Sequence, residues 1–257
     1  MAALLELAEA AARAAGEILL TRWEKPPLGL STKSSATDPA SDADRAAEVA
    51  IIRLIHDSRP DDAIVAEEGG HSAGTSGVRW LIDPLDGTVN YLYGAPHWSV
   101  SICALEGRDA LAAVVFDPVR NELFAAEAGK GGRVGDQRLA VTAETDLSRV
   151  LLATGFSYVA DERGAQARQQ AALIARIRDL RRSGSAALDL AYVAAGRVDA
   201  YMETYANPWD WAAGSLLVRE AGGRVSDVPG VRRGVDGILA SGPGVHDALL
   251  ALAHAKA

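Results

Sequence analysis

The stretch Trp80–Tyr91, which reads WLIDPLDGTVNY, constrains this chain more than any other. An apolar run over 78–82, interrupted by one arginine, is typical of a buried strand. Pro84 fixes its own backbone torsion and lacks an amide hydrogen, so we expect the strand to end at Asp83. Asp83 and Asp86 then place two carboxylates three positions apart. The stretch therefore predicts an acidic site at a strand end.

Gly87 and Thr88 complete this pattern. Glycine lets a ligand approach the backbone closely, and Thr88 is a good N-cap for a following helix. Free amide groups at a helix N-terminus attract anions, whereas carboxylates attract hard cations. Asp-Pro and Asp-Gly pairs are also common turn formers, so either pair alone would predict only a turn. The complete string after an apolar strand favours a site for a metal-bound phosphate.

The composition limits the class of protein. With 257 residues, 49% of them apolar, the chain is long enough for a sizeable core and near the upper end for a single one. The formal net charge is −8 and no basic block exceeds an arginine pair, which argues against nucleic acid or an anionic membrane as a partner. We expect one domain over residues 1–257 that uses cations to handle phosphate.

Cysteine content and charge placement bear on the compartment. Cys103 is the only cysteine, so an intrachain disulfide is impossible and a reducing compartment is expected. The alanine-rich N-terminal segment is interrupted by Glu6, Glu9 and Arg13, so it predicts neither a signal peptide nor a membrane span. These features indicate a cytoplasmic protein.

Hydrophobic periodicity alternates between helical and strand patterns along the chain. Helices are expected over 3–23, 41–55, 162–180, 186–195, 207–222 and 245–255. Strands are expected over 63–66, 78–82, 97–105, 110–116, 122–126, 150–153, 198–203 and 237–241. Pro26 with Pro27 ends the first helix, Ser41 is the expected N-cap of the second, and Asn207 with Pro208 begins the fifth.

Three other patterns predict no catalytic chemistry. Gly129–Gly132 lacks the spacing of a phosphate-binding loop and lies between strand-like segments, so we interpret it as a turn. The five histidines show no metal-ligand spacing, and Cys103 lies in a strand-like run. The sequence contains no Gly-x-Ser-x-Gly elbow. Nucleophilic catalysis by serine or cysteine therefore has little support.

Acidic residues recur where strands end or helices begin. Glu67 follows a short strand, Asp83 and Asp86 follow the central strand, and Asp44 and Asp210 fall in the first turns of helices. Each position has a purely structural explanation, because acids stabilise helix N-termini and strand ends are commonly solvated. One metal and phosphate site explains all of them together, and we favour that interpretation.

At this point the sequence resembles the inositol monophosphatase family of magnesium-dependent, lithium-sensitive sugar phosphatases over nearly its full length. The resemblance rests on Glu67-Glu68, on Trp80–Tyr91 and on the segment 209–223, WDWAAGSLLVREAGG. The last two match the family's paired signatures at the expected separation. The segments 41–44, SDAD, and 184–187, GSAA, agree with the family as well.

The resemblance implies a fold and an assembly. The expected fold class is α/β, a layered α-β-α-β-α sandwich of the inositol monophosphatase and fructose-1,6-bisphosphatase type. The single domain would consist of pseudo-halves over roughly 1–145 and 146–257. The resemblance also implies a homodimer.

The resemblance further implies a metal scheme with two to three Mg²⁺ ions. Glu67, Asp83 and the Leu85 carbonyl would hold the first ion. Asp83, Asp86 and Asp210 would hold the second, with Asp83 bridging the two, and a third, weaker ion would use Glu67 and waters. The chemistry agrees with this scheme, because Mg²⁺ prefers oxygen ligands and two such ions can clamp the attacking and leaving oxygens of an in-line displacement.

Catalytic roles also follow from the resemblance. Thr88 and Asp44, the family's Thr–Asp pair, would accept a proton from the attacking water or orient it. Glu67 would support the same water through the metals. The phosphate would lie between the ions and the amides of Gly87 and Thr88.

Besides Gly87 and Thr88, substrate contacts are implied at five positions. Glu203, seven residues before Asp210, matches the family's acceptor of a sugar hydroxyl. Ser185 and Ala186 match its substrate-contact loop. Asp86 and Asp210 belong to the same substrate-binding set.

The resulting hypothesis is a Mg²⁺-dependent phosphomonoesterase that hydrolyses inositol 1-phosphate. Histidinol phosphate is the alternative substrate, followed by fructose 1,6-bisphosphate or a 3′-phosphonucleotide. The segment 204–209, TYANPW, is bulkier and stiffer than a plain inositol ring needs, and the Gly- and Ser-rich loop 71–77 could add contacts. A non-catalytic metal or sugar-phosphate binding module is a further alternative. Asp44 and Thr88 argue against it, because binding alone does not need a water-activating pair.

Overall fold

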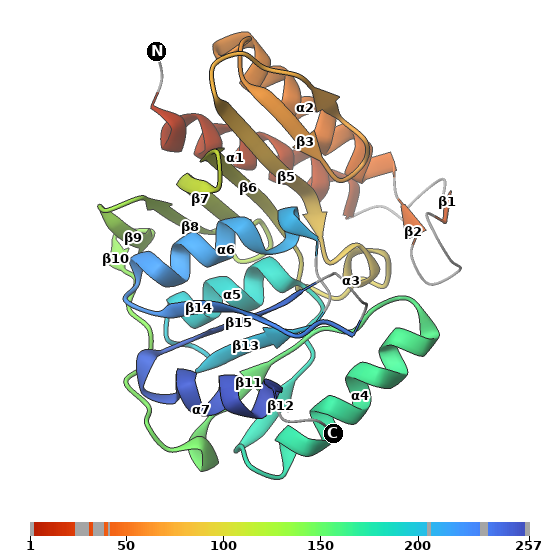
Figure 1. Ribbon diagram of the computed structural model, residues 1–257. Helices are drawn as coiled ribbons and strands as arrows, with labels where there is room; N and C mark the ends of the chain where they lie inside the picture. Colours follow the sequence, from red (N-terminus) through yellow and green to blue (C-terminus); the bar gives the residue numbers. More distant parts are fainter. Residues whose placement is uncertain are drawn as a thin grey trace.

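Two β-sheets, each packed between helices, make up the fold in the computed structural model of this chain (Figure 1). The structure describes residues 3–23, 31–32, 39–40, 42–204, 207–231 and 236–254. Helical and sheet layers alternate, so the predicted α/β layered sandwich is confirmed.

The larger sheet comes from the first part of the chain. Its strands are β3 (Ala63–Ala66), β4 (His71–Ser72), β5 (Val78–Asp86), β6 (Ser99–Glu106), β7 (Asp109–Asp117), β8 (Glu122–Glu127), β9 (Gly131–Val134) and β10 (Gln137–Arg138). They lie in the order β10-β9-β8-β7-β6-β5-β3-β4, and only β3 and β5 pair in parallel. Ala66 pairs with Ile82. Glu67, the residue after β3, therefore lies beside Asp83, which is still within β5.

The smaller sheet comes from the second part of the chain. Its strands are β11 (Leu151–Ala153), β12 (Asp179–Arg181), β13 (Ala200–Glu203), β14 (Arg224–Val228) and β15 (Gly237–Ser241). Their order is β12-β11-β13-β15-β14, with β11 parallel to both of its neighbours and the other pairs antiparallel. A separate two-stranded pair joins β1 (Ser31–Thr32) and β2 (Pro39–Ala40).

The helices separate into three layers. They are α1 (Leu4–Trp23), α2 (Asp42–Ser58), α3 (Thr88–Leu92), α4 (Ala160–Ile174), α5 (Ala186–Ala194), α6 (Pro208–Glu220) and α7 (Pro243–His254), with a 3₁₀ turn at Leu147–Arg149. Helices α1 and α2 cover the outer face of the larger sheet, α5 and α6 lie between the sheets, and α4 and α7 cover the smaller sheet (Figure 1). Among the described residues, no helix combines the length and the apolar character that crossing a bilayer requires.

Side chains of the central strands point alternately to the two faces of the larger sheet, and each face has its own hydrophobic core. In β6, Val100 and Ile102 pack in the cluster beneath α1 and α2, whereas Cys103 and Leu105 pack in the cluster around α5 and α6. Successive side chains of a strand point to opposite faces of a sheet, so a sheet covered on both sides needs apolar residues at consecutive positions. This explains why the sequence shows continuous apolar runs here.

Pro84 does not end the central strand, contrary to our expectation. Strand β5 continues to Asp86, and its pairing with β6 shifts register between Asp83 and Asp86. A bulge accommodates proline because its unpaired residue needs no amide hydrogen. The expected break is therefore a bulge within the strand.

Several short strands were also missed by the sequence analysis. In the larger sheet these are β4, β9 and β10, and Gly131 and Gly132, which we interpreted as part of a turn, begin β9. In the smaller sheet they are β12 and β14. The helix predicted over 162–180 ends at Ile174, and β12 follows it; β14 was not predicted at all. Strands β12 and β14 lie at the two edges of the smaller sheet, and their apolar and polar residues alternate only weakly. Pairing with a neighbouring strand therefore decides their conformation more than their own sequence does. The predicted cap at Ser41 and the helix end at Pro26-Pro27 fall outside the described residues.

The contact between α5 and α6 generates a test of the packing. A methyl group on Gly214 in α6 would lie 2.4 Å from Leu190 Cβ in α5. Gly214→Ala is expected to cost about 1–3 kcal/mol of stability through overpacking. The Tm should fall by roughly 2–4 °C for each kcal/mol in a chain of this size.

The matched control is Gly164→Ala in α4, where the nearest heavy atom to an added methyl group lies 3.8 Å away. Alanine favours a helix interior by about 0.5–1 kcal/mol over glycine, so this Tm should stay level or rise slightly. Equal Tm values for the two variants in calorimetry would contradict the close α5–α6 contact.

Candidate active site

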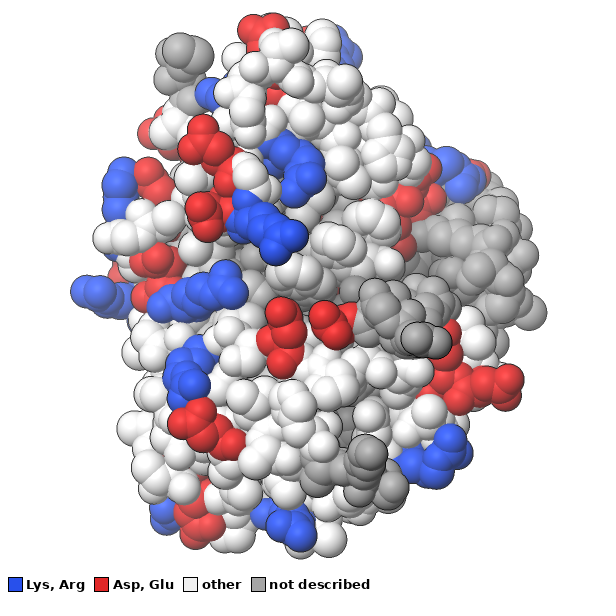
Figure 2. Space-filling model, viewed as in Figure 1, with Lys and Arg blue, Asp and Glu red and all other residues white. Residues whose placement is uncertain are grey.

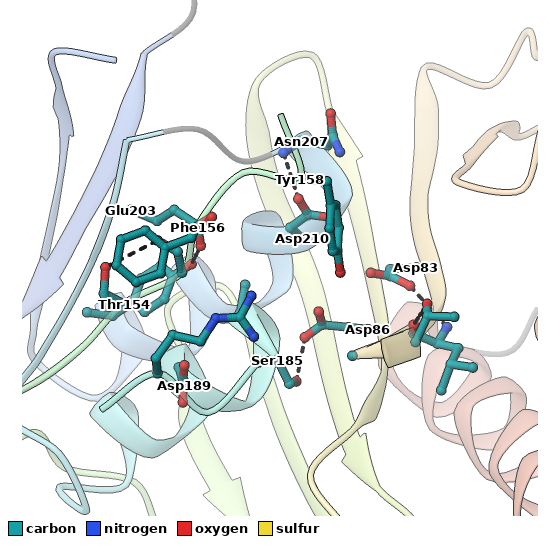
Figure 3. A pocket seen from close by; sticks show the side chains of 18 of the residues that line it. Asp83, Asp86, Thr154, Phe156, Tyr158, Ser185, Asp189, Glu203, Asn207 and Asp210 are labelled. Atoms are coloured by element: carbon teal, nitrogen blue, oxygen red, sulfur yellow. Dashed lines mark hydrogen bonds between the residues drawn. The ribbon is translucent and has the colours of Figure 1, made fainter. Parts of the chain in front are cut away.

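The acidic residues at the strand and helix ends meet at one cavity of about 120 Å³ (Figure 3). In the figure Glu203 and Phe156 lie on one side and Asp83 on the other. The predicted site residues in its wall are Glu67, Asp83, Leu85, Asp86, Gly87, Thr88, Ser185, Ala186, Glu203 and Asp210. The structure thus brings together every predicted site residue except Asp44. None of the loop residues 71–77 is among those lining the cavity.

The bulge in β5 shapes the floor of this cavity. Asp83 Oδ1 accepts a hydrogen bond from the Leu85 amide at 3.0 Å. The Thr88 hydroxyl donates to the Leu85 carbonyl at 3.1 Å. These two bonds hold a carboxylate, a carbonyl and a hydroxyl together within one short turn.

Gly87, rather than Thr88, is the N-cap of α3, which corrects the prediction. Gly87 has a φ of 95°, and a Cβ there would lie 3.0 Å from the His97 carbonyl oxygen and 3.2 Å from that of Gly184. Glycine adopts this left-handed conformation without steric cost. Thr88 is the first helical residue, so its hydroxyl contacts the Leu85 carbonyl instead of capping the helix.

Glu67, Asp83 and Asp210 form the tightest acidic group. One carboxylate oxygen of each lies within 4.8 Å of the others. Burial raises the pKa of Asp83 well above its usual range, and the nearby charge of Glu67 raises it further. The pKa of Asp210 is raised for the same two reasons. Carboxylates this close and this buried resist being charged together unless a cation lies among them.

Asp86 connects this group to the start of α5. Its Oδ2 accepts hydrogen bonds from the Ser185 hydroxyl at 2.5 Å and from the Ala187 amide at 2.7 Å. Burial raises the pKa of Asp86 to about 6, although both hydrogen bonds pull it down. Ser185 is also the N-cap of α5 and accepts from the Leu188 amide. The predicted substrate loop therefore holds the second carboxylate of the central motif.

Asp44 lies behind the cavity wall. It belongs to the first turn of α2 and has no exposed surface. Its charge contributes to the raised pKa of Asp83, so the two carboxylates are electrostatic neighbours. Its predicted pairing with Thr88 stays a prediction.

Glu203 closes the cavity on the side of the smaller sheet. The Tyr201 hydroxyl donates to Glu203 Oε2, and a Cβ on Gly155 would lie 2.0 Å from that oxygen. Burial raises the pKa of Glu203 to about 7, while the Tyr201 hydrogen bond and the Arg182 charge pull it down. Gly155 therefore leaves the room that this carboxylate occupies.

Comparison with known proteins agrees with this geometry. The model of the inositol monophosphatase family matches residues 1–256. The chain belongs to this family. Nus factor SuhB of Escherichia coli K12 is 44% identical over 256 residues, which cover 96% of this chain and 94% of that protein.

Solved structures of family members superpose over nearly the whole chain. Inositol monophosphatase from Anabaena (Nostoc) sp. matches with a TM-score of 0.83 at 36% identity, covering 96% of this chain and 94% of that one. SaIMPase-II with bound inositol monophosphate matches with a TM-score of 0.78 at 25% identity, covering 96% and 92%. The family fold therefore includes both sheets and all three helical layers.

The structure adds cavity residues that the family motifs in this sequence did not reveal. They are Thr154, Gly155, Phe156, Tyr158, Arg182, Asp189, Tyr201 and Asn207. Thr154, Gly155, Phe156 and Tyr158 follow β11, which was predicted, and Arg182 follows β12, which was not. Of the described residues lining the cavity, only Arg182 is a cation, and its sequence signal was merely that of an arginine pair.

Asn90 lies in the Trp80–Tyr91 segment, beyond its two carboxylates, and has a structural role there. Its side-chain amide donates to the His97 carbonyl at 2.6 Å and to the Ser183 carbonyl at 2.8 Å. These bonds tie α3 to the loop that precedes α5, and that loop carries Ser185. Asn90 thus helps to position the partner of Asp86.

The acidic site predicts a pH-dependent stability in metal-free protein. Folding raises the pKa of Glu203 to about 7 and that of Asp86 to about 6, so the folded chain binds these protons more tightly than the unfolded chain. The stabilisation is complete below about pH 4 and is lost as the pH rises through the folded pKa values. The Glu203 contribution is on the order of 2 kcal/mol, allowing for screening by water in the cavity.

The measurement is the Tm in EDTA at pH 5 and pH 8 for wild type and for Glu203→Gln, which lacks the titrating carboxyl. The fall in Tm between the two pH values should be larger for wild type. An identical fall in both proteins would show that Glu203 keeps an ordinary pKa.

Proposed function

We propose that this chain is a Mg²⁺-dependent phosphomonoesterase that hydrolyses inositol 1-phosphate. The observation that carries the proposal is the group of Glu67, Asp83 and Asp210, whose carboxylate oxygens lie within 4.8 Å of one another in the cavity wall. Membership of the inositol monophosphatase family supports phosphatase chemistry. The choice of substrate rests on the cavity wall around Glu203.

The donor set fits Mg²⁺, because every donor is an oxygen and the raised pKa values of Asp83 and Asp210 show carboxylates that a cation would stabilise. Glu67, Asp83 and the Leu85 carbonyl would hold one ion. Asp83, Asp86 and Asp210 would hold a second, and a third would use Glu67 and water. When bound, Mg²⁺ lowers the pKa of a water and offsets the charge of the phosphoryl group.

Thr88 and Asp44 would orient the attacking water. The Thr88 hydroxyl donates to the Leu85 carbonyl, which leaves its lone pairs to accept a hydrogen bond from water. The buried Asp44 places a negative charge behind this turn. The amides at the start of α3, around Gly87, would receive the phosphate.

Glu203 would accept a hydrogen bond from a hydroxyl of the polyol. Tyr201 holds its Oε2, so the substrate meets a carboxylate fixed in one orientation. Ser185 lines the cavity between Glu203 and Asp83, Ala186 is also among its lining residues, and Phe156 offers an aromatic face. A ring that carries hydroxyls and a single phosphate matches this wall.

The alternative substrates fit less well. Fructose 1,6-bisphosphate brings a second phosphate, and Arg182 is the only cation among the described residues that line the cavity. A 3′-phosphonucleotide would need room for a base. Histidinol phosphate could place its ammonium against Glu203, so it stays the principal alternative.

Asp83→Asn is expected to lower kcat/KM by at least about 100-fold, because it removes the charge shared by two cation positions. The same change should raise the Tm in EDTA, since it relieves repulsion with Glu67. Mg²⁺ should raise the Tm of wild type and leave that of the variant nearly unchanged.

Asp57→Asn is the matched control, because Asp57 is exposed on α2 and its one ion pair within the described residues is a surface pair with Arg53 at 3.7 Å. Its activity and its Mg²⁺ response should equal those of wild type. Full activity of Asp83→Asn at ordinary Mg²⁺ concentration would contradict the metal scheme.

Glu203→Gln tests the substrate. It keeps the shape of the side chain and removes a charge-assisted hydrogen bond worth about 1.5–3 kcal/mol, so kcat/KM for inositol 1-phosphate should fall by roughly 10–100-fold. p-Nitrophenyl phosphate has no neighbouring hydroxyl and should lose little. A larger loss on histidinol phosphate than on inositol 1-phosphate would favour the alternative. An equal loss on all three substrates would withdraw the hydroxyl-binding role.

Assembly, lithium response and compartment are further parts of the proposal. We expect a cytoplasmic homodimer, inhibition by Li⁺ and two to three Mg²⁺ ions per site, as the family resemblance implies. Size-exclusion chromatography with light scattering and a Li⁺ titration of phosphate release test the first two.

A second role as a Nus factor is the other candidate, because relatives of that name match 96% of the chain. Such a role would depend on the surface of the protein. Exchange of the E. coli relative for this chain, as wild type and as Asp83→Asn, separates the two roles. Loss of function only in the variant would assign the role to the phosphatase.

A further inference from the structure

A second hollow of about 710 Å³ lies between α6, the near ends of β5 and β6, and strands β14 and β15. We call it the α6 groove. Figure 2 views this face of the molecule, with Lys and Arg side chains above its centre and Asp and Glu side chains below. The described residues that line the α6 groove include none of those that line the catalytic cavity. The two hollows are therefore distinct, although α6 contributes to both.

One wall of the α6 groove is basic. Arg79, Arg108 and Arg219 line it and are exposed. Within the described part of the chain, none of the three forms an ion pair, and Arg79 donates only to the Gly107 carbonyl at 3.3 Å. Arg197, in contrast, is paired with Glu122. The wall thus presents three guanidinium groups to an anion, in a chain whose formal net charge is −8.

The floor of the α6 groove is apolar and carries an aromatic ring. Leu81, Leu105 and Ile238 form part of it, and the half-buried Trp211 lies among them. Tryptophan offers a flat face that can stack on another ring. A hollow of this volume and lining falls in the range of small-molecule sites.

Ser215 supplies a second, independent sign of a ligand. Its side chain is 1% exposed, lines the α6 groove, and its Oγ has no hydrogen-bond partner among the described residues. A buried hydroxyl without a partner is costly, so such groups ordinarily meet a protein, water or ligand atom. Ser215 lies one helical turn from Trp211, on the same face of α6.

The opposite wall limits the charge of the occupant. Asp227 and Asp236 line it and are exposed. They repel a polyanion and accept hydrogen bonds from a donor group. The occupant that suits both walls has one anionic end and one donor end.

We propose that the α6 groove binds a small aromatic anion that carries an amino group on its ring. The anionic group would lie against the arginines, the ring against Trp211, and the amino group against Asp227 and Asp236. The Ser215 hydroxyl would donate to the anionic group. This site goes beyond the proposed phosphatase activity and does not depend on it.

The probe is 5-amino-1-naphthalenesulfonate, which cannot be hydrolysed by a phosphatase, titrated with the full chain in EDTA and followed by fluorescence anisotropy. Saturable binding of one probe per chain is expected with a Kd below about 1 mM. The double variant Arg108→Gln/Arg219→Gln should raise the Kd about tenfold or more, because it removes two charged donors. Ser215→Ala, which leaves the helix intact, should raise it about threefold.

The matched control is Arg53→Gln/Arg168→Gln, which removes the same charge from exposed positions of α2 and α4 outside the groove. Its Kd should equal that of wild type, as should that of Asp83→Asn in the catalytic cavity. Naphthalene-1-sulfonate, which lacks the amino group, should bind more weakly. The proposal is overturned by failure to saturate, by equal Kd values for the groove and control double variants, or by equal affinity for the two sulfonates. Loss of binding in Asp83→Asn alone would assign the probe to the catalytic cavity and overturn it too.

Discussion

Repulsion among buried carboxylates is the constraint on which the rest of this structure depends. Asp83 and Asp210 have raised pKa values because burial removes water from them and because Glu67 lies beside them. A fold that keeps such a group must hold each member from a different element, or the acids would move apart. Here the turn after β3, strand β5 and helix α6 each supply one, so the tertiary structure opposes the repulsion that a divalent cation would relieve.

The parallel pairing of β3 with β5 is the local cause of this arrangement. Among the described strands of the larger sheet it is the one parallel pair, and it places Glu67 beside Asp83. The bulge that contains Pro84 then aims Asp83 and Asp86 into the cavity. Gly87 follows in a left-handed conformation and lets the chain turn into α3 close to the loop before α5.

Helix α6 contributes residues to the walls of both the catalytic cavity and the α6 groove. The Asn207 amide donates to Asp210 at its start, so that carboxylate caps the helix and also faces the catalytic cavity. The structural explanation of Asp210 is therefore confirmed, and its position in the cavity wall is compatible with the proposed metal role. Trp211, the next residue, faces the α6 groove instead, because consecutive helical residues point about 100° apart.

The fold class and most residues of the acidic site could be predicted from the sequence. Apolar periodicity gave the main helices and strands, because both faces of the larger sheet are covered and its strands are continuously apolar. The acids of the site sit at element ends, where a motif of fixed spacing is visible without coordinates. The short edge strands β12 and β14 were not accessible, since their conformation depends on pairing with distant segments.

What the sequence determined by itself was local: the apolar strand over 78–82, the short helix that follows Gly87, the helix start at Asn207, and the identity of the oxygen-bearing side chains. Only the tertiary structure decided what each group faces. It placed Asp86 against Ser185 and Ala187, Glu203 against Tyr201 and Gly155, and Asp44 behind the wall. The reason is physical: burial and charge–charge distance set a pKa, and both are properties of residues that lie far apart along the chain.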